Sequence, residues 1–275
     1  MKYVYRPLRF YLTVYAATWL FWLLAILSGD GIVCTVFMLL GLLAPATVAV
    51  LTVFRSGSDA LKADFRKKLV GFYRLRPKSI LLAVCVFAAV VAASILLSTL
   101  FGQSLDQFAF TDDFSFSGAG VSSALLTILL ASSIEELGWR GYGEDSIAQY
   151  CTWWKESLIF GVVWPLWHLP LLWVPGTYQY GLRELGLLYA VNFFVSGMPL
   201  GFLTTWVYLK NNRSMLANII FHLFVNFMQE RVAMTPETKC VETVAVFAAA
   251  AVVVLRNRDI FFETGHIGRL PDFEG

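Results

Sequence analysis

The sequence predicts an all-α, polytopic membrane helix bundle with about eight transmembrane helices, folded as a single membrane domain over residues 1–275. Hydrophobic residues make up 58% of the chain and charged residues only 15%, whereas a typical soluble domain has about 25% charged residues. Apolar runs follow one another along the chain, and most are long enough to cross a hydrocarbon layer about 30 Å thick. No polar linker divides them, which favours one domain over two.

Eight apolar runs carry this prediction. The seventh is short for a span, so it requires tilt or local thinning of the bilayer. The first follows Lys2, Arg6 and Arg9 as a signal peptide would, but it is long for one and lacks an obvious cleavage site, so we expect a retained helix. The runs are residues 10–28, 32–54, 79–102, 121–137, 157–174, 187–209, 214–228 and 241–255.

The basic residues predict the orientation. An even number of spans places both termini on one side, and that side then carries 18 of the 21 lysines and arginines. Basic residues concentrate in cytoplasmic loops. We therefore expect a multi-pass protein of the cell membrane with both termini in the cytoplasm. The net charge of +2 gives no reason to expect a nucleic-acid partner, and the four cysteines form neither a disulfide framework nor a zinc ribbon.

Residues 55–78 form a cytoplasmic connector that predicts an amphipathic helix lying at the membrane interface. A solvated, charged connector is the alternative. The apolar positions recur at helical spacing with basic residues between them; they are Leu61, Phe65, Leu69 and Phe72, separated by Lys62, Arg66 and Lys67.

Few ionisable residues fall inside the predicted spans, where each costs on the order of 3 kcal/mol on insertion scales. Glu135 and Glu136 lie near the cytoplasmic end of the fourth run, His168 lies in the fifth and His222 in the seventh. Side chains with such a cost are the first candidates for function.

Helical spacing assigns these residues different tasks, because residues four apart share a face and neighbours point about 100° apart. Glu136 and Arg140 are expected to pair as an anchor, which leaves Glu135 free to point into the bundle. His222 and Asn226 are expected to face one cavity. His168 follows Trp164 by one turn, with Pro165 between them to kink the helix.

A carboxylate, two imidazoles and a carboxamide suit amide hydrolysis without a covalent nucleophile. A carboxylate in a partly apolar site is a useful general base towards water, and an imidazole with an amide N–H can stabilise an oxyanion. The structural alternatives are glutamates that pair with arginine at a helix end, a packed His168, and His222 and Asn226 as hydrogen bonds between helices. Asn192 and Asn218 are interpreted as structural, and Trp19, Trp22 and Trp173 as lipid-facing or interfacial.

These residues, in this order, resemble the motifs of the CPBP family, the CAAX prenyl protease type II and bacteriocin-processing intramembrane proteases. The E-E-x-x-x-R motif is matched by Glu135, Glu136 and Arg140, and the H-x-x-x-N motif by His222 and Asn226. The aromatic-x-x-x-H motif, usually begun by phenylalanine, is matched by Trp164 and His168, where the ring is expected to pack. The resemblance covers residues 121–229, the core that carries the motifs.

The resemblance implies an eight-helix bundle with a cavity open to lipid and cytoplasm. It further implies that Glu135 and His168 activate water and that His222 and Asn226 hold the oxyanion. No H-E-x-x-H motif is present. A zinc site formed by Glu135, His168 and His222 is chemically possible, but it would lack an independent base, so we expect a metal-free mechanism without a cofactor.

The family members differ in substrate, and the sequence does not choose between them. Archetypal members remove the last three residues after a prenylated cysteine, whereas prokaryotic members are associated with bacteriocin maturation, immunity or membrane-protein processing. The expected partners are the lipid bilayer and a peptide or protein substrate reached from membrane and cytoplasm. The alternatives are a non-catalytic immunity scaffold and a proton-coupled transporter; convergence of Glu135, His168, His222 and Asn226 on one cavity favours the protease.

Overall fold

The computed structural model describes residues 3–111 and 124–262. Within these residues the chain is a helical bundle, and the only β contact is an isolated antiparallel bridge between Phe110 and Val232. The all-α prediction is confirmed. Each of the eight predicted runs overlaps one long helix, although the third and fifth runs extend into short 3₁₀-helices and residues 121–123 of the fourth lie outside the described residues. The helices are α1 (Pro7–Ser28), α2 (Ile32–Phe54), α4 (Pro77–Ser98), α5 (Ala124–Gly138), α7 (Trp153–Trp167), α9 (Leu187–Lys210), α10 (Met215–Arg231) and α11 (Pro236–Arg256).

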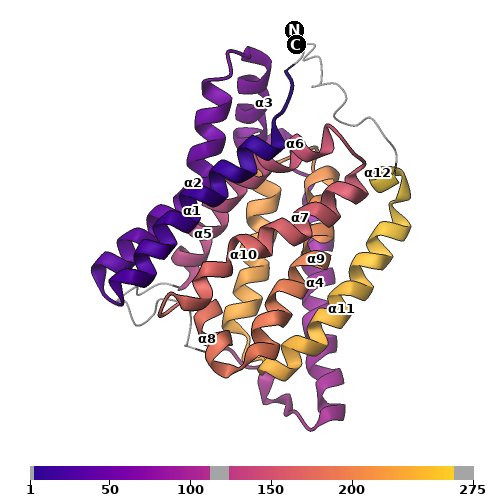
Figure 1. Cartoon of the computed structure of the whole chain (residues 1–275). Coiled ribbons are helices and arrows are strands. Elements are labelled where there is room, and N and C mark those ends of the chain that lie inside the picture. Colours follow the sequence, from indigo (N-terminus) through magenta and orange to yellow (C-terminus); the bar gives the residue numbers. More distant parts are fainter. Residues whose placement is uncertain (1–2, 112–123, 263–275) are drawn as a thin grey trace.

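Shorter elements connect these helices. A π-helix, η5 (Trp139–Gly143), links α5 to α6 (Glu144–Ala148), and a 3₁₀-helix, η6 (Leu169–Trp173), follows α7. The remaining elements are α3 (Asp59–Val70), η1 (Phe72–Arg74), η2 (Thr99–Phe101), η3 (Leu105–Phe108), α8 (Tyr178–Leu185) and α12 (Arg258–Phe262). In Figure 1 the start of α1 and the end of α12 lie at the same end of the bundle, which we call the terminal end.

Several helices have the length and composition to cross a membrane, so the chain is a multi-pass membrane protein. Five described helices meet this criterion, and a sixth span results if the pair Trp153–Trp173 and Tyr178–Leu185, bent by 74°, counts as one. Helices α5 and α10 have only 15 and 17 residues. The count of eight spans therefore stays a prediction.

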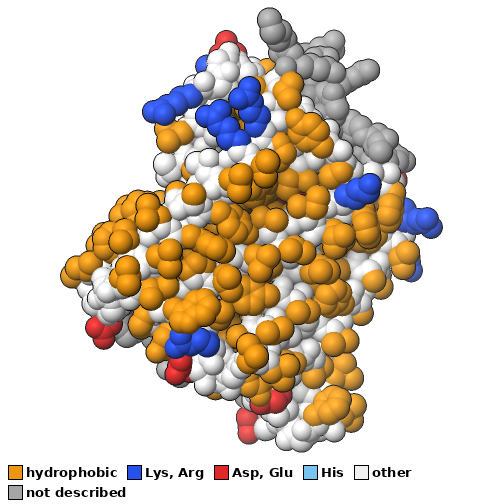
Figure 2. Space-filling model, in the orientation of Figure 1, with side chains coloured by type: hydrophobic (Ala, Val, Ile, Leu, Met, Phe, Trp, Pro, Cys, Tyr) orange, Lys and Arg blue, Asp and Glu red, His pale blue; other side chains and the backbone are white. Residues whose placement is uncertain are grey.

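The molecular surface has the polarity expected of a bundle in lipid. Figure 2 shows hydrophobic side chains across the middle of one face, with lysines and arginines gathered towards the upper, terminal end and acidic side chains at the lower end. Large apolar side chains of the long helices point outwards, including Leu81, Val244 and Leu255, each more than half exposed. Trp22 differs from its predicted lipid-facing position: it is 1% exposed and donates to the Met38 carbonyl at 2.9 Å.

The predicted connector helix is present as α3, but Leu61 and Phe65 are buried against the bundle itself and do not form a face open to the membrane interface. Phe72 is instead largely exposed, because the helix ends at Val70. The buried face also carries two charged residues, Asp64 and Lys68, which the apolar pattern did not predict. This helix is thus fixed to the bundle by ionic contacts as well as by apolar packing.

These contacts form a buried ionic cluster at the terminal end. Lys68 lies 2.7 Å from Asp145 and 3.4 Å from Asp64, and Arg213 bonds to both carboxylates. Burial opposes ionisation of Asp145, but Arg213 and Lys68 outweigh it and lower its pKa to about 2. The φ of Arg213 is +61°, a left-handed conformation uncommon for a non-glycine residue. Its two ion pairs therefore hold the turn that starts α10.

Close helix packing positions α7 against α9. A Cβ atom at Gly161 would lie 2.7 Å from the Met198 carbonyl oxygen, and one at Gly201 would lie 2.8 Å from the Gly161 Cα. Only hydrogen in place of a side chain permits this approach, as is usual for small residues between membrane helices. The contact fixes the lower part of α7, where the site residues Trp164 and His168 lie.

Candidate active site

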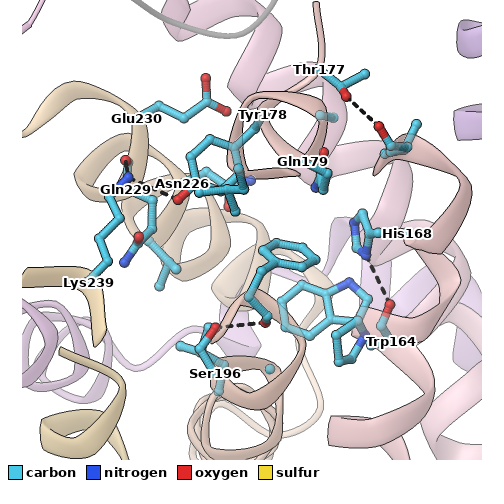
Figure 3. Close-up of a pocket in the computed structure, with 18 of the residues that line it drawn as sticks. Trp164, His168, Thr177, Tyr178, Gln179, Ser196, Asn226, Gln229, Glu230 and Lys239 are labelled. Atoms are coloured by element: carbon cyan, nitrogen blue, oxygen red, sulfur yellow. Dashed lines mark hydrogen bonds between the residues drawn. The ribbon is translucent and has the colours of Figure 1, made fainter. Parts of the chain in front are cut away.

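The four predicted catalytic residues converge on one cavity of about 210 Å³. Glu135 enters it from α5, His168 from the end of α7, and His222 and Asn226 from successive turns of α10. Segments separated by 91 positions are thus brought together, as the protease interpretation requires. Figure 3 shows part of this cavity, with Trp164 and His168 on one side and Asn226, Gln229 and Lys239 on the other.

Glu135 is 5% exposed, and its carboxylate has two neighbours. Oε2 accepts a hydrogen bond of 2.8 Å from the Trp164 indole N–H and lies 3.9 Å from Nε2 of His168. A separation of 3.9 Å is too long for a direct hydrogen bond, and a gap of this kind between polar groups suits a bridging water. Glu135 is therefore held by Trp164 while it faces His168.

His168 caps the C-terminus of α7, where the helix gives way to η6. Its Nδ1 lies 3.0 Å from the Trp164 carbonyl oxygen. A carbonyl only accepts, so Nδ1 carries the proton and donates it. In the neutral ring the lone pair is then on Nε2, the atom that faces Glu135. Pro165 contributes to this geometry, because its carbonyl accepts from the His168 backbone N–H at 2.9 Å in a tightened last turn.

Glu136 pairs with Arg140 at 3.0 Å, as predicted from their spacing. The same oxygen, Oε1, also lies 2.9 Å from Nδ1 of His222. Glu136 is therefore more than an anchor: its carboxylate accepts the Nδ1 proton and orients the ring of His222. Arg140 contacts Glu144 at 2.8 Å as well, and all three side chains are fully buried.

The buried charges around Arg140 do not balance if every acid is ionised. Glu136, Glu144 and Glu156 are all fully buried and act electrostatically on this one guanidinium. Glu144 lies in the connector beyond α5, where burial raises its pKa to about 8 although Arg140 opposes the shift. The raised pKa favours the protonated form of Glu144, whereas Glu136 contacts both Arg140 and His222 next to the site.

Asn226 and Ser132 meet across the cavity wall. The Asn226 amide N–H donates to Ser132 Oγ at 3.4 Å, a long hydrogen bond. Asn226 is half-buried, so this contact orients the amide while leaving it accessible. The i,i+4 spacing with His222 places both side chains on the same face of α10, as expected.

Trp164 contacts two of the predicted catalytic residues, which sequence reasoning did not predict. Its ring was expected only to pack, but its N–H bonds to Glu135 and its plane lies edge-on to His222, with centroids 5.2 Å apart at 88°. Sequence reasoning also missed Ser132, which contacts Asn226, and the polar residues Tyr178, Gln179, Gln229 and Lys239, which line the cavity. Asn192, interpreted as structural, lines it too and donates to the Lys239 carbonyl at 3.2 Å.

The possible zinc site was tested on the positions of its three side chains. Among the described residues no three His, Cys, Asp or Glu side chains are arranged to hold a metal ion. His168 and Glu135 approach each other at 3.9 Å, whereas His222 bonds to Glu136 through Nδ1. The described side chains, as placed, do not surround a common metal position, so no step through a metal is derived, and the metal-free mechanism stays a prediction.

The cavity lies in the half of the bundle away from the termini. Beyond Glu135, the chain passes through the buried layer of Glu136, Arg140 and Glu144 before it reaches the terminal end. The resemblance implied a cavity open to lipid and cytoplasm, and this opening stays a prediction.

Comparison with known proteins agrees with this geometry. Residues 117–228 match the model of the Rce1-like type II CAAX prenyl endopeptidases. The chain is also 38% identical to the CAAX prenyl protease 2 of Methanococcus maripaludis over 266 residues, which cover 95% of this chain and 98% of the relative. The chain belongs to the CPBP family of CAAX prenyl proteases. It is accordingly a CPBP-type intramembrane protease, and its matched region includes all four convergent residues.

Within this CPBP protease the side chains that line the cavity include an apolar group and a polar group from different helices, which we call its two limbs. The apolar limb is lined from α1, α2 and the first half of α5, by Trp22, Met38, Leu42, Ile128 and Ala131. The polar limb is lined from α8, the end of α10 and the start of α11, by Tyr178, Gln179, Gln229, Lys239 and Glu242. A substrate with one apolar and one polar part fits this division.

Proposed function

We propose that the protein hydrolyses a peptide bond near the C-terminus of a membrane-associated or lipidated protein, with water activated by Glu135 and His168. The observation that carries the proposal is the 3.9 Å gap between Glu135 Oε2 and His168 Nε2, in a cavity that also receives His222 and Asn226. Two basic atoms at this separation can share one water and leave it facing the cavity.

In the proposed reaction Glu135 accepts a proton from the water while its oxygen attacks the carbonyl carbon. The carbonyl oxygen becomes an oxyanion facing His222 and the Asn226 amide. Collapse of the tetrahedral intermediate breaks the C–N bond, and the leaving amine takes the proton held by Glu135 or His168. The products are a free carboxylate on the substrate protein and a short peptide with a free amine.

His222 needs a second ring proton to stabilise the oxyanion. Its Nδ1–H is committed to Glu136 at 2.9 Å, so only an Nε2–H can reach an oxyanion. The ring then carries a positive charge, and Glu136 supplies the matching negative charge. This makes Glu136 a positioning residue whose effect on the reaction passes through His222.

The two limbs suggest how a lipidated tail would lie. The apolar limb is continuous with α1 and α2, two helices of the bundle surface, and suits a hydrocarbon chain that enters from the bilayer. The relative from Methanococcus maripaludis is named a CAAX prenyl protease, and prenylated substrates carry a hydrocarbon chain next to the cleaved bond. We propose the same class here, a prenylated tail entering sideways from the lipid.

We propose further that the terminal end of the bundle faces the cytoplasm of the cell, as the basic residues predict. Val70 at the terminal end and Phe110 at the other end are both more than 60% exposed. After replacement of the four native cysteines, a cysteine at 110 should react with an impermeant reagent added outside cells, whereas one at 70 should not. Strong external labelling at 70 would reverse the topology.

The hydrolytic mechanism is tested with protein reconstituted in liposomes and a fluorogenic peptide that carries a prenylated cysteine. Glu135→Gln, His168→Ala and His222→Ala should each lower kcat by about 10²–10⁴, with unchanged thermal unfolding. Arg183→Gln, at a half-buried position outside the cavity lining, is the control and should match the native protein. Full activity of Glu135→Gln would exclude Glu135 as the base.

A further inference from the structure

The polar limb of the cavity ends at a single cation. Lys239 is the only lysine or arginine among the described residues that line the cavity. We propose that Lys239 binds the C-terminal carboxylate of the substrate and thereby sets how many residues are released. This inference rests on the proposed function, and it adds a specificity-determining residue outside the matched motifs, on α11.

The surroundings of Lys239 leave it ready for a ligand. Its ammonium donates to the Tyr178 hydroxyl at 2.9 Å and to the Gln229 carbonyl at 2.8 Å, and it lies 4.7 Å from the centroid of the Tyr178 ring. These contacts use two of its three N–H donors. The side chain is half-buried, so the third donor is positioned at the cavity and is accessible.

Nearby acidic groups do not remove this capacity. The Glu242 carboxylate accepts two hydrogen bonds from the Gln229 amide, at 2.7 and 2.8 Å, and it forms no ion pair with Lys239 within the described residues. The partners of Lys239 are a neutral hydroxyl and a neutral carbonyl. Glu242 acts on Lys239 electrostatically without a hydrogen bond. Among the described residues an incoming carboxylate would be the first charged group to accept a hydrogen bond from Lys239, and charge-assisted hydrogen bonds are roughly twice as strong as neutral ones.

The distance from Lys239 to the reacting groups matches a short peptide. Gln229, whose carbonyl holds the ammonium, follows His222 by seven residues on α10, which is a rise of about 10 Å along a helix. Three residues in an extended chain span about 10 Å. A peptide bond placed at His222 therefore puts the carboxylate of a three-residue tail next to Lys239, and Figure 3 shows the cavity between His168 and Lys239 that such a tail would occupy.

The experiment compares substrates that differ only at their last atom. Two prenylated peptides with three residues after the modified cysteine are used, one with a free C-terminal carboxylate and one with a C-terminal amide. Native protein should cleave the carboxylate peptide with a kcat/KM about 10- to 100-fold higher, the range expected for one hydrogen bond to a charged group. In Lys239→Gln this ratio should fall towards one, mainly through KM.

Two further variants separate recognition from structure. Lys239→Arg keeps a cation and should retain most of the preference for the carboxylate. Arg183→Gln removes a half-buried cation that does not line the cavity, and it should change the cleavage rate of neither peptide. A peptide with one additional residue should be cleaved less well than the three-residue peptide by the native protein, and Lys239→Gln should lose this distinction as well.

The outcomes distinguish the two proposals. Native protein that cleaves both three-residue peptides equally, or Lys239→Gln that slows both by the same factor, overturns the role of Lys239 and leaves the proposed function intact. Native protein that cleaves neither peptide, while its folding is normal, rejects the proposed function for this substrate class and the role of Lys239 with it.

Discussion

Replacement of Glu136 by glutamine would change both the stability of the bundle and the state of His222. Glu136 is fully buried, and its Oε1 contacts Arg140 at 3.0 Å and His222 at 2.9 Å. Removal of one partner from a buried ion pair costs about 3–5 kcal/mol. Glutamine keeps an oxygen that can accept from Arg140, so we expect a loss of about 3 kcal/mol in the free energy of unfolding, at the lower end of that range.

The chemical effect of Glu136→Gln should be separate. Glutamine carries no negative charge to balance a doubly protonated His222, and its NH₂ group can face Nδ1 and impose the wrong tautomer. An equivalent change next to a catalytic histidine lowers kcat by about 10⁴ in serine proteases. We therefore expect kcat to fall by about 10²–10⁴, measured with the peptide assay on protein that remains folded at low temperature.

Glu144→Gln is the matched control, because Glu144 contacts the same arginine and not His222. With a pKa of about 8 it is already protonated at pH 7, and glutamine resembles that neutral form. Glu144→Gln should cost little stability and leave kcat unchanged. If it lowers kcat as much as Glu136→Gln does, the effect passes through Arg140. A Glu136→Gln protein that is fully stable yet inactive would instead exchange the roles assigned to the two adjacent glutamates.

Three other predictions concern the metal, Trp164 and the ionic cluster. Activity should survive exhaustive chelation. The metal-free mechanism would be overturned if chelation abolished activity, zinc restored it, and the native protein held about one zinc per chain that His168→Ala lacked. Trp164→Phe keeps an aromatic ring but removes the N–H that holds Glu135 at 2.8 Å, so kcat should fall about 10-fold or more with little change in KM. Trp173→Phe, at an exposed position, is the control, and an equal loss of kcat there would indicate an effect of general packing. The thermal stability should vary with pH in two steps. The raised pKa of Glu144 gives stability that is full below about pH 4.5 and is lost as the pH rises through about 8. The lowered pKa of Asp145 gives stability that is present above about pH 4 and is lost as the pH falls towards 2. Unfolding curves should show the alkaline step disappear in Glu144→Gln, and a step that persists there would assign it to another group.

The sequence alone located the helices and the ionisable residues within them. Apolar runs must form helices in lipid because every backbone polar group needs an internal partner, and each of the eight runs overlaps one long helix. Glu135, His168 and His222 were conspicuous because a charged or polar group inside a span is costly. The pairing of Glu136 with Arg140 followed from helical spacing, since it lies within one helix.

Contacts between helices depended on the tertiary structure, because periodicity fixes neither the rotation of a helix nor its depth against its neighbours. The bond from Trp164 to Glu135 and that from His222 to Glu136 join different helices, and Lys239 reaches the cavity only through the packing of α11 on α9 and α4. Trp22 was assigned to lipid although it is buried, because lipid and a helix interface are equally apolar. The sequence therefore named the reacting groups, while the rotation and depth of the packed helices determined which of them orient one another.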